Sequence, residues 1–391
     1  MNRILYLSFD GILEPLGYSQ ILSYLKHLSS NFNITIISVE KKNDVLNTTH
    51  FNMINKEIKD ANIDWIFLNY SNNKIGKIIL IIKLFFKIAY ILKKKKINII
   101  HARSYITGLL SFFLKKILNF YLIFDIRGFW IEERINWGLW NKNTIKYKIF
   151  KYFEGNLFRK SDIIVTLTND AKKIILDNKN LNLKKSNIFV VPTSVNLANQ
   201  KSISNNSDKL VFTHLGAIGS RYNFEAYLKV TNKIYQSKKV FLSIINKGEH
   251  IKIKKNLDKY NINKNNFKIN FVPPYNINFE IQKSNFGIFF PVSGFYLKAY
   301  FPTKLGEFLT NGIPVITLKI NEHVDSIILQ NNVGILIDNI DNINYESLTL
   351  KIKLLLNDKN ITKRCQFVAK KYFNIKNAVE TYSEIYTKIT K

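Results

Sequence analysis

The chain has 391 residues, 46% of them hydrophobic, which is enough for about two domains with separate cores. Its formal net charge is +30, but only seven of the 58 basic residues are Arg. Nucleic-acid readers depend on Arg, so we expect anionic membranes and anionic ligands as partners rather than nucleic acid. The single cysteine, Cys365, excludes a disulfide framework. The N-terminus lacks the apolar run of a signal peptide, and both features favour a cytoplasmic location.

The first half of the chain alternates strand-like apolar runs with helical patterns. Strands are predicted near residues 4–9, 34–39, 63–68, 97–101, 121–125, 163–167 and 188–191. Helices are predicted near 18–29, 49–61, 74–96, 104–118 and 143–160. Strands that alternate with helices favour an open, doubly wound α/β sheet.

The helix predicted at 74–96 is the best candidate for membrane contact. Its apolar run is interrupted by Lys83 and Lys87 and is shorter than the roughly 20 residues that cross a bilayer. A helix packed on the sheet is the simplest interpretation. The alternative is a helix that lies on an anionic membrane through Phe85, Phe86 and its terminal lysines.

A polar stretch at 196–209 has the composition of a linker, and a second alternating series follows it. The predicted strands are near 210–215, 240–245, 267–272, 286–290, 314–318 and 333–337. A last helix is predicted at about 376–390, where Val379, Tyr382, Ile385 and Ile389 recur at helical spacing.

The segment between the strands at 286–290 and 314–318 predicts a phosphate site. Pro302 and Thr303 are typical of a helix start, which leaves the amides of Thr303 and Lys304 free for an anion beside the Lys304 ammonium. Glu307, one turn further, can accept hydrogen bonds from a diol. The pattern indicates a nucleotide-sugar pocket; the alternative is an ordinary helix start in an α/β domain.

Two other clusters follow predicted strands, at the edge where open sheets bind ligands. Gly216, Gly219 and Arg221 follow the strand at 210–215, where glycines admit a diphosphate and Arg can bind it with two hydrogen bonds; the alternative is a tight turn with a surface Arg. Asp125 and Arg127 follow the strand at 121–125 and either contact substrate or form a structural ion pair. His101 and Arg103 lie at the end of the strand at 97–101 and have ligand contact and a structural role as alternatives. Trp130 belongs to a cluster with Trp137 and Trp140 that suits an interface or a sugar platform, with core packing as the alternative.

The motif Pro302-x-Lys304-x-x-Glu307 before Gly312-Ile-Pro314-Val315 resembles the donor-binding signature of the family 4 retaining glycosyltransferases, which have the GT-B fold. In many members a first Glu contacts the donor sugar, but that position is Ala299 here. Matches in the same order extend over about four fifths of the chain: FDGILEPLGYSQ, HARS, FDIRGFWIEER, VVPTSV and LGAIGSRYN.

The resemblance implies two Rossmann-like domains that face each other across a cleft, with a last helix crossing back to the first domain. The expected parts are an acceptor-side domain at 1–195, a linker at 196–209, a nucleotide-sugar domain at 210–375 and the returning helix at 376–391. The implied function is transfer of a sugar from a UDP- or GDP-linked donor to a saccharide acceptor, lipid-linked, in bacterial surface polysaccharide synthesis. The enzyme would be peripheral at the inner face of the membrane, with no metal or cofactor.

The resemblance and the residue patterns together assign three groups of site residues. The expected catalytic residues are Asp125, Arg127, Arg221 and Lys304. The expected donor-binding residues are Gly216, Gly219, Arg221, Lys247, Pro302, Thr303, Lys304 and Glu307. The expected acceptor-side residues are Gly11, Gly17, Ser19, His101, Arg103 and Trp130. The alternative function, left open by Ala299, is a basic nucleic-acid-binding or scaffold protein on a degenerate GT-B fold.

Overall fold

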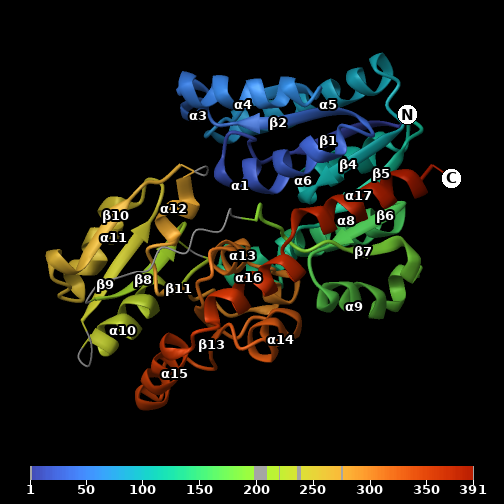
Figure 1. The fold of residues 1–391 in the computed structure, drawn as a ribbon. Coiled ribbons are helices and arrows are strands. Elements are labelled where there is room, and N and C mark those ends of the chain that lie inside the picture. The colour runs from blue at the N-terminus through green and yellow to red at the C-terminus, as the bar shows by residue number, and fades with distance from the viewer. Residues whose placement is uncertain (1, 198–208, 220, 236–238, 274–275, 391) are drawn as a thin grey trace. The chain divides into compact units, whose positions relative to one another are not determined.

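The computed structural model describes residues 2–197, 209–219, 221–235, 239–273 and 276–390. The chain falls into two compact units (Figure 1). Unit 1 comprises Met1–Pro192 and Ile375–Lys391, and unit 2 comprises Thr193–Asn374. Most of the linker predicted at 196–209 lies outside the described residues.

Unit 1 is built on a seven-stranded parallel sheet in the order β3-β2-β1-β4-β5-β6-β7. Near-continuous apolar strands suit it because helices cover both of its faces. The strands are β1 (Arg3–Ser8), β2 (Asn33–Glu40), β3 (Asp64–Asn69), β4 (Ile99–Arg103), β5 (Tyr121–Asp125), β6 (Ile163–Thr166) and β7 (Ile188–Val190). The fourth strand ends two residues later than predicted, so Arg103 is its last residue.

The first helical segment of unit 1 differs from the prediction. It begins at Pro15 and contains a π-helical turn before the regular helix, an irregularity that is frequent at functional sites. Its parts are α1 (Pro15–Gly17), η1 (Tyr18–Leu22) and α2 (Ser23–Leu28). The other helices are α3 (Lys42–Leu46), α4 (Thr48–Asp60), α5 (Lys74–Lys94), α6 (Ser104–Leu114), α7 (Trp130–Asn136), α8 (Ile145–Lys160), α9 (Asn169–Asp177) and α17 (Ile375–Lys388), with 3-10 turns η2 (Lys179–Leu181) and η3 (Lys185–Asn187).

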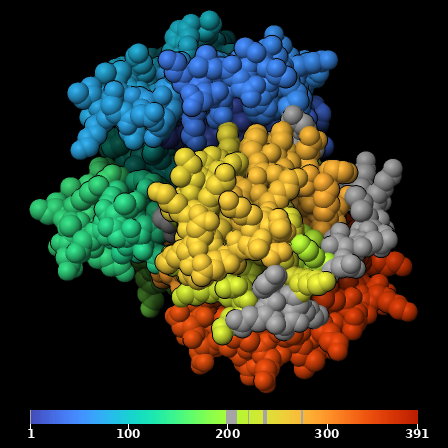
Figure 2. All heavy atoms as spheres, turned by 90° about the vertical axis from the view of Figure 1, so that its left-hand side faces the viewer, coloured from blue at the N-terminus to red at the C-terminus, as the bar shows by residue number. Residues whose placement is uncertain are grey.

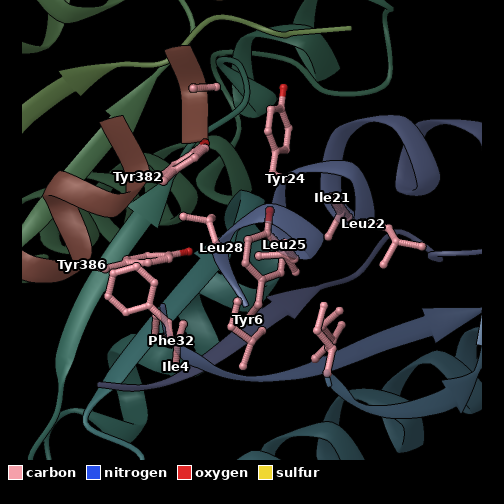
Figure 3. Close-up of a cluster of buried hydrophobic side chains, with 14 of the residues drawn as sticks. Ile4, Tyr6, Ile21, Leu22, Tyr24, Leu25, Leu28, Phe32, Tyr382 and Tyr386 are labelled. Atoms are coloured by element: carbon pink, nitrogen blue, oxygen red, sulfur yellow. The ribbon is translucent and has the colours of Figure 1, made fainter. Parts of the chain in front are cut away.

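The last helix, α17, completes the core of unit 1. It contacts α2, and its Tyr382 and Tyr386 are buried in the same apolar cluster as Ile4 and Tyr6 of β1. Figure 3 shows both tyrosines projecting from α17 into the cluster, Tyr386 beside Phe32 and Tyr382 on the side of Tyr24. The C-terminal residues are therefore an integral part of the first Rossmann-like domain.

Unit 2 has a six-stranded parallel sheet in the order β10-β9-β8-β11-β12-β13. Its strands are β8 (Leu210–Leu215), β9 (Val240–Ile245), β10 (Phe267–Asn270), β11 (Phe286–Phe289), β12 (Val315–Leu318) and β13 (Gly334–Ile337). Its helices are α10 (Phe224–Tyr235), α11 (His250–Lys259), α12 (Ile277–Ile281), α13 (Thr303–Thr310), α14 (Glu322–Gln330), α15 (Tyr345–Asn357) and α16 (Ile361–Tyr372), with 3-10 turns η4 (Lys264–Asn266) and η6 (Phe295–Ala299). Figure 2 shows α11 and β10, in yellow, on the face of unit 2 that is turned toward the viewer.

The predicted α/β fold with two parallel, Rossmann-like domains is confirmed. Every predicted strand is present in one of the two sheets, because buried parallel strands give long β-branched and aromatic runs that are easily recognised. The apolar segment predicted at 74–96 is α5, and none of the described helices is long and apolar enough to cross a membrane.

Candidate active site

In unit 2, the turn after β8 meets the first turn of α13. Gly216 has a positive φ of 95°, and a Cβ atom there would lie 3.2 Å from Nζ of Lys304. The ring of Tyr222 lies against the same ammonium, with its centroid 3.4 Å from Nζ. Pro302 occupies the N-cap of α13, and Thr303 is its first residue. The glycine turn and the helix start predicted as two parts of one site are thus in contact.

The charges of Lys304 and Glu307 are both disfavoured by burial. Lys304 is 9% exposed, and its Nζ has no hydrogen-bond partner in the described part of the chain. Burial lowers the pKa of Lys304 to about 7, although Glu307 opposes the change. Burial likewise raises the pKa of Glu307 to about 7, with Lys304 opposing. An anionic ligand at Nζ would supply the missing partner and restore the full positive charge.

The side chains of Glu249 and Asn246, which were not predicted as site residues, hydrogen-bond to the backbone of the glycine turn. The carboxylate of Glu249 accepts hydrogen bonds from the Ile218 amide and from the side-chain amide of Asn246, both at 2.9 Å. Asn246 also donates to the carbonyl oxygen of Gly216 at 3.0 Å. These contacts fix the direction of the backbone at the carboxyl end of β8.

The other predicted donor-binding residues lie around this contact. Gly219 sits beside Glu249, where a Cβ atom would be 3.7 Å from its Oε1. Arg221 is exposed and precedes Tyr222, and its positive charge influences the Tyr222 hydroxyl. Lys247 is exposed in the loop that follows β9.

In unit 1, Asp125 is fully buried at the end of β5 and is surrounded by polar groups. Its Oδ2 accepts a hydrogen bond from the Tyr382 hydroxyl at 3.2 Å. The same oxygen lies 3.6 Å from Nη1 of Arg127 and 3.5 Å from Nε2 of His101. Burial alone would raise the pKa of Asp125, but Arg127 and then His101 hold it below its ordinary value. Its Oδ1 has no hydrogen-bond partner among the residues that the structure describes.

Two arginines at the same sheet edge have donors that make no hydrogen bond to any described residue. Arg127 adopts a left-handed backbone with φ 53°, a conformation that costs a non-glycine residue free energy and that often accompanies functional sites. Arg103, the last residue of β4, lies 3.7 Å from Asp10. Nη1 of Arg127 and Nε and Nη1 of Arg103 are buried without hydrogen-bond partners within the described ranges. These donors and Oδ1 of Asp125 can serve a polar ligand such as a sugar.

His101, by contrast, is only 1% exposed. Its ring lies among Tyr6, Tyr382 and Tyr386, with centroid distances of 4.4, 5.2 and 5.8 Å. Burial lowers the pKa of His101, which keeps the imidazole neutral. The geometry therefore favours support of Asp125 over direct contact with an acceptor.

The loop after β1 and the helical turns that follow it carry three of the predicted acceptor-side residues, Gly11, Gly17 and Ser19, and an unpredicted carboxylate fixes the loop. Gly17 packs so closely that a Cβ atom there would be 1.8 Å from the carbonyl oxygen of Gly11. Glu40, at the end of β2, accepts hydrogen bonds from the amides of Ile12 at 2.7 Å and Leu13 at 3.1 Å. Ser19 is half-buried in the π-helical turn that follows the loop.

Trp130, the last predicted acceptor-side residue, belongs to an aromatic cluster. Its ring stacks on Tyr105 at 5.8 Å and meets Trp140 edge-on at 5.2 Å. These contacts favour packing between α7 and its neighbours. Across the described ranges no three His, Cys, Asp or Glu side chains gather as a metal site.

Comparisons with known proteins show a sequence similarity in unit 2 and a similarity of fold over the whole chain. Residues 196–372 match the family described as "Glycosyl transferases group 1". The fold is similar to that of sucrose-phosphate synthase from Thermosynechococcus elongatus, with a TM-score of 0.76 and 12% identity over 100% of this chain and 99% of that one. It is also similar to a glycosyltransferase from Rickettsia africae, with a TM-score of 0.68 and 18% identity over 100% and 99% of the two chains. A third similar structure is Anabaena HepE in complex with UDP and glucose, with a TM-score of 0.69 and 11% identity over 99% and 100%. No curated protein sequence matches the chain.

At these identities the structural similarities establish the fold, while the sequence match concerns unit 2. Residues 196–372 thus carry the sequence pattern of the group 1 glycosyl transferases, and the chain as a whole has the GT-B fold of such enzymes.

Proposed function

We propose that the chain is a retaining glycosyltransferase that uses a UDP- or GDP-linked sugar. The observation that carries the proposal is the buried ammonium of Lys304 at the start of α13, which contacts the Gly216 turn and has no hydrogen-bond partner among the described residues. A helix N-terminus, a glycine turn and a cation together suit a diphosphate. The UDP bound to Anabaena HepE, which has the same fold, supports this choice of ligand.

In the proposed reaction, unit 2 stabilises the leaving diphosphate. Lys304, Arg221 and the first amides of α13 would neutralise the charge that develops as the bond to the sugar breaks. Each such donor is worth roughly 2–4 kcal/mol in a transition state. Glu307 would accept hydrogen bonds from the ribose hydroxyls and fix the nucleoside.

Unit 1 would serve the reacting sugar and the acceptor. Oδ1 of Asp125 and the guanidinium groups of Arg127 and Arg103, which form charged contacts but have donors without a hydrogen bond in the described part of the chain, can bind sugar hydroxyls directly. The carboxylate is ionised near neutral pH, because its pKa is held below the ordinary value. Retention of configuration, which the resemblance implies, then follows a front-face path in which the acceptor hydroxyl attacks from the side of the departing diphosphate.

We further propose that the acceptor is lipid-linked and that the protein acts at the inner face of a membrane in surface polysaccharide synthesis. The support is α5, whose buried stripe faces the sheet while its opposite face is apolar and exposed. Phe86 is 66% exposed and Ile75 is 72% exposed, and lysines flank this face. The exposed apolar residues of α5 are Ile75, Ile78, Ile79, Ile81, Ile82, Phe86 and Tyr90.

The same face of the unit 1 sheet carries more exposed apolar groups. The connections from β3 to β4, from β4 to β5 and from β5 to β6 run in one direction along the sheet, so right-handed crossovers place α5, α6 and α8 on one face. Ile117 after α6 is 71% exposed and Tyr152 on α8 is 66% exposed. Apolar groups among lysines suit an anionic bilayer surface.

Nucleotide binding tests the proposal most directly. Calorimetric titration with UDP, GDP and ADP should give saturable binding of one of the first two. Lys304→Gln and Glu307→Gln should each weaken it about tenfold, as expected for a lost charge-assisted hydrogen bond. Lys254→Gln, on an exposed face of α11, is the charge-matched control. Binding of duplex DNA, without binding of any nucleoside diphosphate, would favour the scaffold alternative.

A further inference from the structure

Two tyrosine hydroxyls of the last helix, α17, contact the buried side chains of His101 and Asp125. The Tyr386 hydroxyl lies 2.7 Å from Nδ1 of His101, and the Tyr382 hydroxyl donates to Oδ2 of Asp125 at 3.2 Å. All four residues belong to unit 1, although the tyrosines are more than 250 positions from their partners. Figure 3 shows Tyr382 and Tyr386 side by side on α17, both turned inward from the helix.

These contacts determine where the protons lie. The carboxylate of Asp125 can only accept hydrogen bonds when it is ionised. Nε2 of His101 faces Oδ2 of Asp125 at 3.5 Å, so the neutral imidazole places its hydrogen on Nε2. Nδ1 is then an acceptor, and the Tyr386 hydroxyl must donate to it. This tautomer pairs Nδ1 with the Tyr386 hydroxyl and turns the Nε2 hydrogen toward Oδ2 of Asp125. That charged contact, at 3.5 Å, is longer than a hydrogen bond, and Nε2 has no hydrogen-bond partner among the described residues.

We propose that Tyr382 and Tyr386 are positioning residues for the acceptor-side reaction. Tyr386 fixes the ring and the tautomer of His101, and His101 together with Tyr382 and Arg127 holds Oδ2 of Asp125. This arrangement leaves Oδ1 for the substrate. The inference rests on the proposed function, because it assumes that Asp125 serves the reacting sugar. It assigns the C-terminal helix a role in turnover, in addition to its packing.

The test removes each hydroxyl and keeps each ring. In Tyr382→Phe and Tyr386→Phe the edge contact of residue 386 with Phe32, at 5.2 Å, is retained, so the fold should persist. Tyr105→Phe is the matched control, because its buried hydroxyl donates to Glu154 at 2.7 Å, away from the pair. We expect kcat to fall roughly 10- to 100-fold in the two variants, as it does when a residue that orients a functional side chain through a hydrogen bond is replaced. Their nucleotide affinity, and the kcat of Tyr105→Phe, should remain unchanged. Unchanged kcat in both variants, or an equal loss in Tyr105→Phe, would overturn the proposal.

A second measurement does not depend on turnover. The ¹⁵N spectrum of the His101 imidazole, assigned by its loss in His101→Gln, should show an unprotonated, hydrogen-bonded Nδ1 in the wild-type protein. Tyr386→Phe should shift that resonance and Tyr105→Phe should not. A protonated Nδ1 in the wild type would overturn the assignment. If the wild-type protein shows the expected resonances but has no transferase activity, the result counts against the glycosyltransferase function. It still supports the inference that Tyr386 fixes the tautomer of His101.

Discussion

The ammonium of Lys304 lies 3.4 Å from the centroid of the Tyr222 ring, inside a site that otherwise offers it no hydrogen-bond acceptor from the described chain. An aromatic face stabilises a cation by roughly 0.5–2 kcal/mol, which is less than the hydration that burial removes. In the ligand-free protein the charged form of Lys304 is therefore destabilised relative to the same lysine in water, and its pKa falls to about 7. A ligand with anionic oxygens would relieve this destabilisation, which is the expected property of a diphosphate site.

Replacing this lysine should make the free protein more stable and less able to bind nucleotide. Lys304→Met keeps an unbranched apolar stem and removes the buried charge. We therefore expect the free energy of unfolding to be about 1–3 kcal/mol larger than that of the wild type near pH 7. The pKa of Lys304 is about 7 in the folded protein and 10.5 for an ordinary lysine. Between pH 7 and pH 10.5, Lys304 is therefore protonated in the unfolded chain and largely neutral in the folded protein. The stability of the wild type should rise with pH across that window, and the advantage of the variant should shrink.

Thermal unfolding at pH 7 and pH 9, with and without UDP or GDP, measures both effects. Lys254→Met on α11 is the control for loss of an exposed lysine. A Lys304→Met protein that is less stable than the wild type at pH 7, or that keeps full nucleotide affinity, would contradict this account of the site.

A second prediction concerns the carboxylate that fixes the loop after β1. Glu40 accepts the amides of Ile12 and Leu13, and Glu40→Gln replaces one acceptor oxygen by a donor that opposes an amide. We expect the free energy of unfolding of Glu40→Gln to be about 1–3 kcal/mol smaller than that of the wild type, which is the cost of an unsatisfied buried hydrogen-bonding group. Hydrogen exchange at the Ile12 and Leu13 amides should accelerate. Glu225→Gln, in an exposed ion pair with Lys259, should change little; equal effects of the two substitutions would argue against a special role for Glu40.

The sheets could be predicted from the sequence because their signal is local. Runs such as those of β5 and β12 are apolar on both faces, as only buried parallel strands require. The helix start at Thr303 was predictable for the same reason, since Pro302 and the following residues carry the pattern within a single turn. The sequence assigned Gly216 and Lys304 to one donor site, since ligands gather at the carboxyl ends of strands, and the structure adds that the two residues lie in contact.

The supporting residues could not be predicted because their contacts are long-range. Tyr382 appeared in the sequence only as one apolar position of a helical stripe, and its bond to Asp125 joins residues 257 positions apart. Glu40 left a weak signal, an acid at the end of the second strand, but nothing local shows that it turns toward the loop after β1. His101 could be placed near the strand end, yet only the packing of α17 shows that it is covered.

The exposed face of α5 leads to a third prediction. Phe86→Asp places a charge at the centre of that face and removes the transfer free energy of a phenylalanine, about 1.5–3 kcal/mol. Binding to anionic phospholipid vesicles should weaken tenfold or more. Phe367→Asp, at a 63% exposed position of α16 in unit 2, is the control. Wild-type binding should also decline with salt, because charges are screened over about 10 Å at 0.1 M. Vesicle binding that is the same for both variants and the wild type would exclude this face as the membrane contact.

The last prediction separates the roles of the two units. Arg221 belongs to unit 2 and should contact the diphosphate, which is present in the donor and in the product nucleotide. Arg221→Gln should therefore weaken binding of the bare nucleoside diphosphate about tenfold, because a charge-assisted hydrogen bond is lost in the ground state as well. Asp125 belongs to unit 1 and should interact chiefly with the transferring sugar. Asp125→Asn preserves the shape of the side chain, so nucleotide affinity should remain nearly unchanged while kcat falls about 100-fold or more. Calorimetric affinity and transfer rate, measured on both variants, give the comparison. Loss of nucleotide binding in a folded Asp125→Asn protein, or full transfer activity in it, would show that the division of labour is wrong.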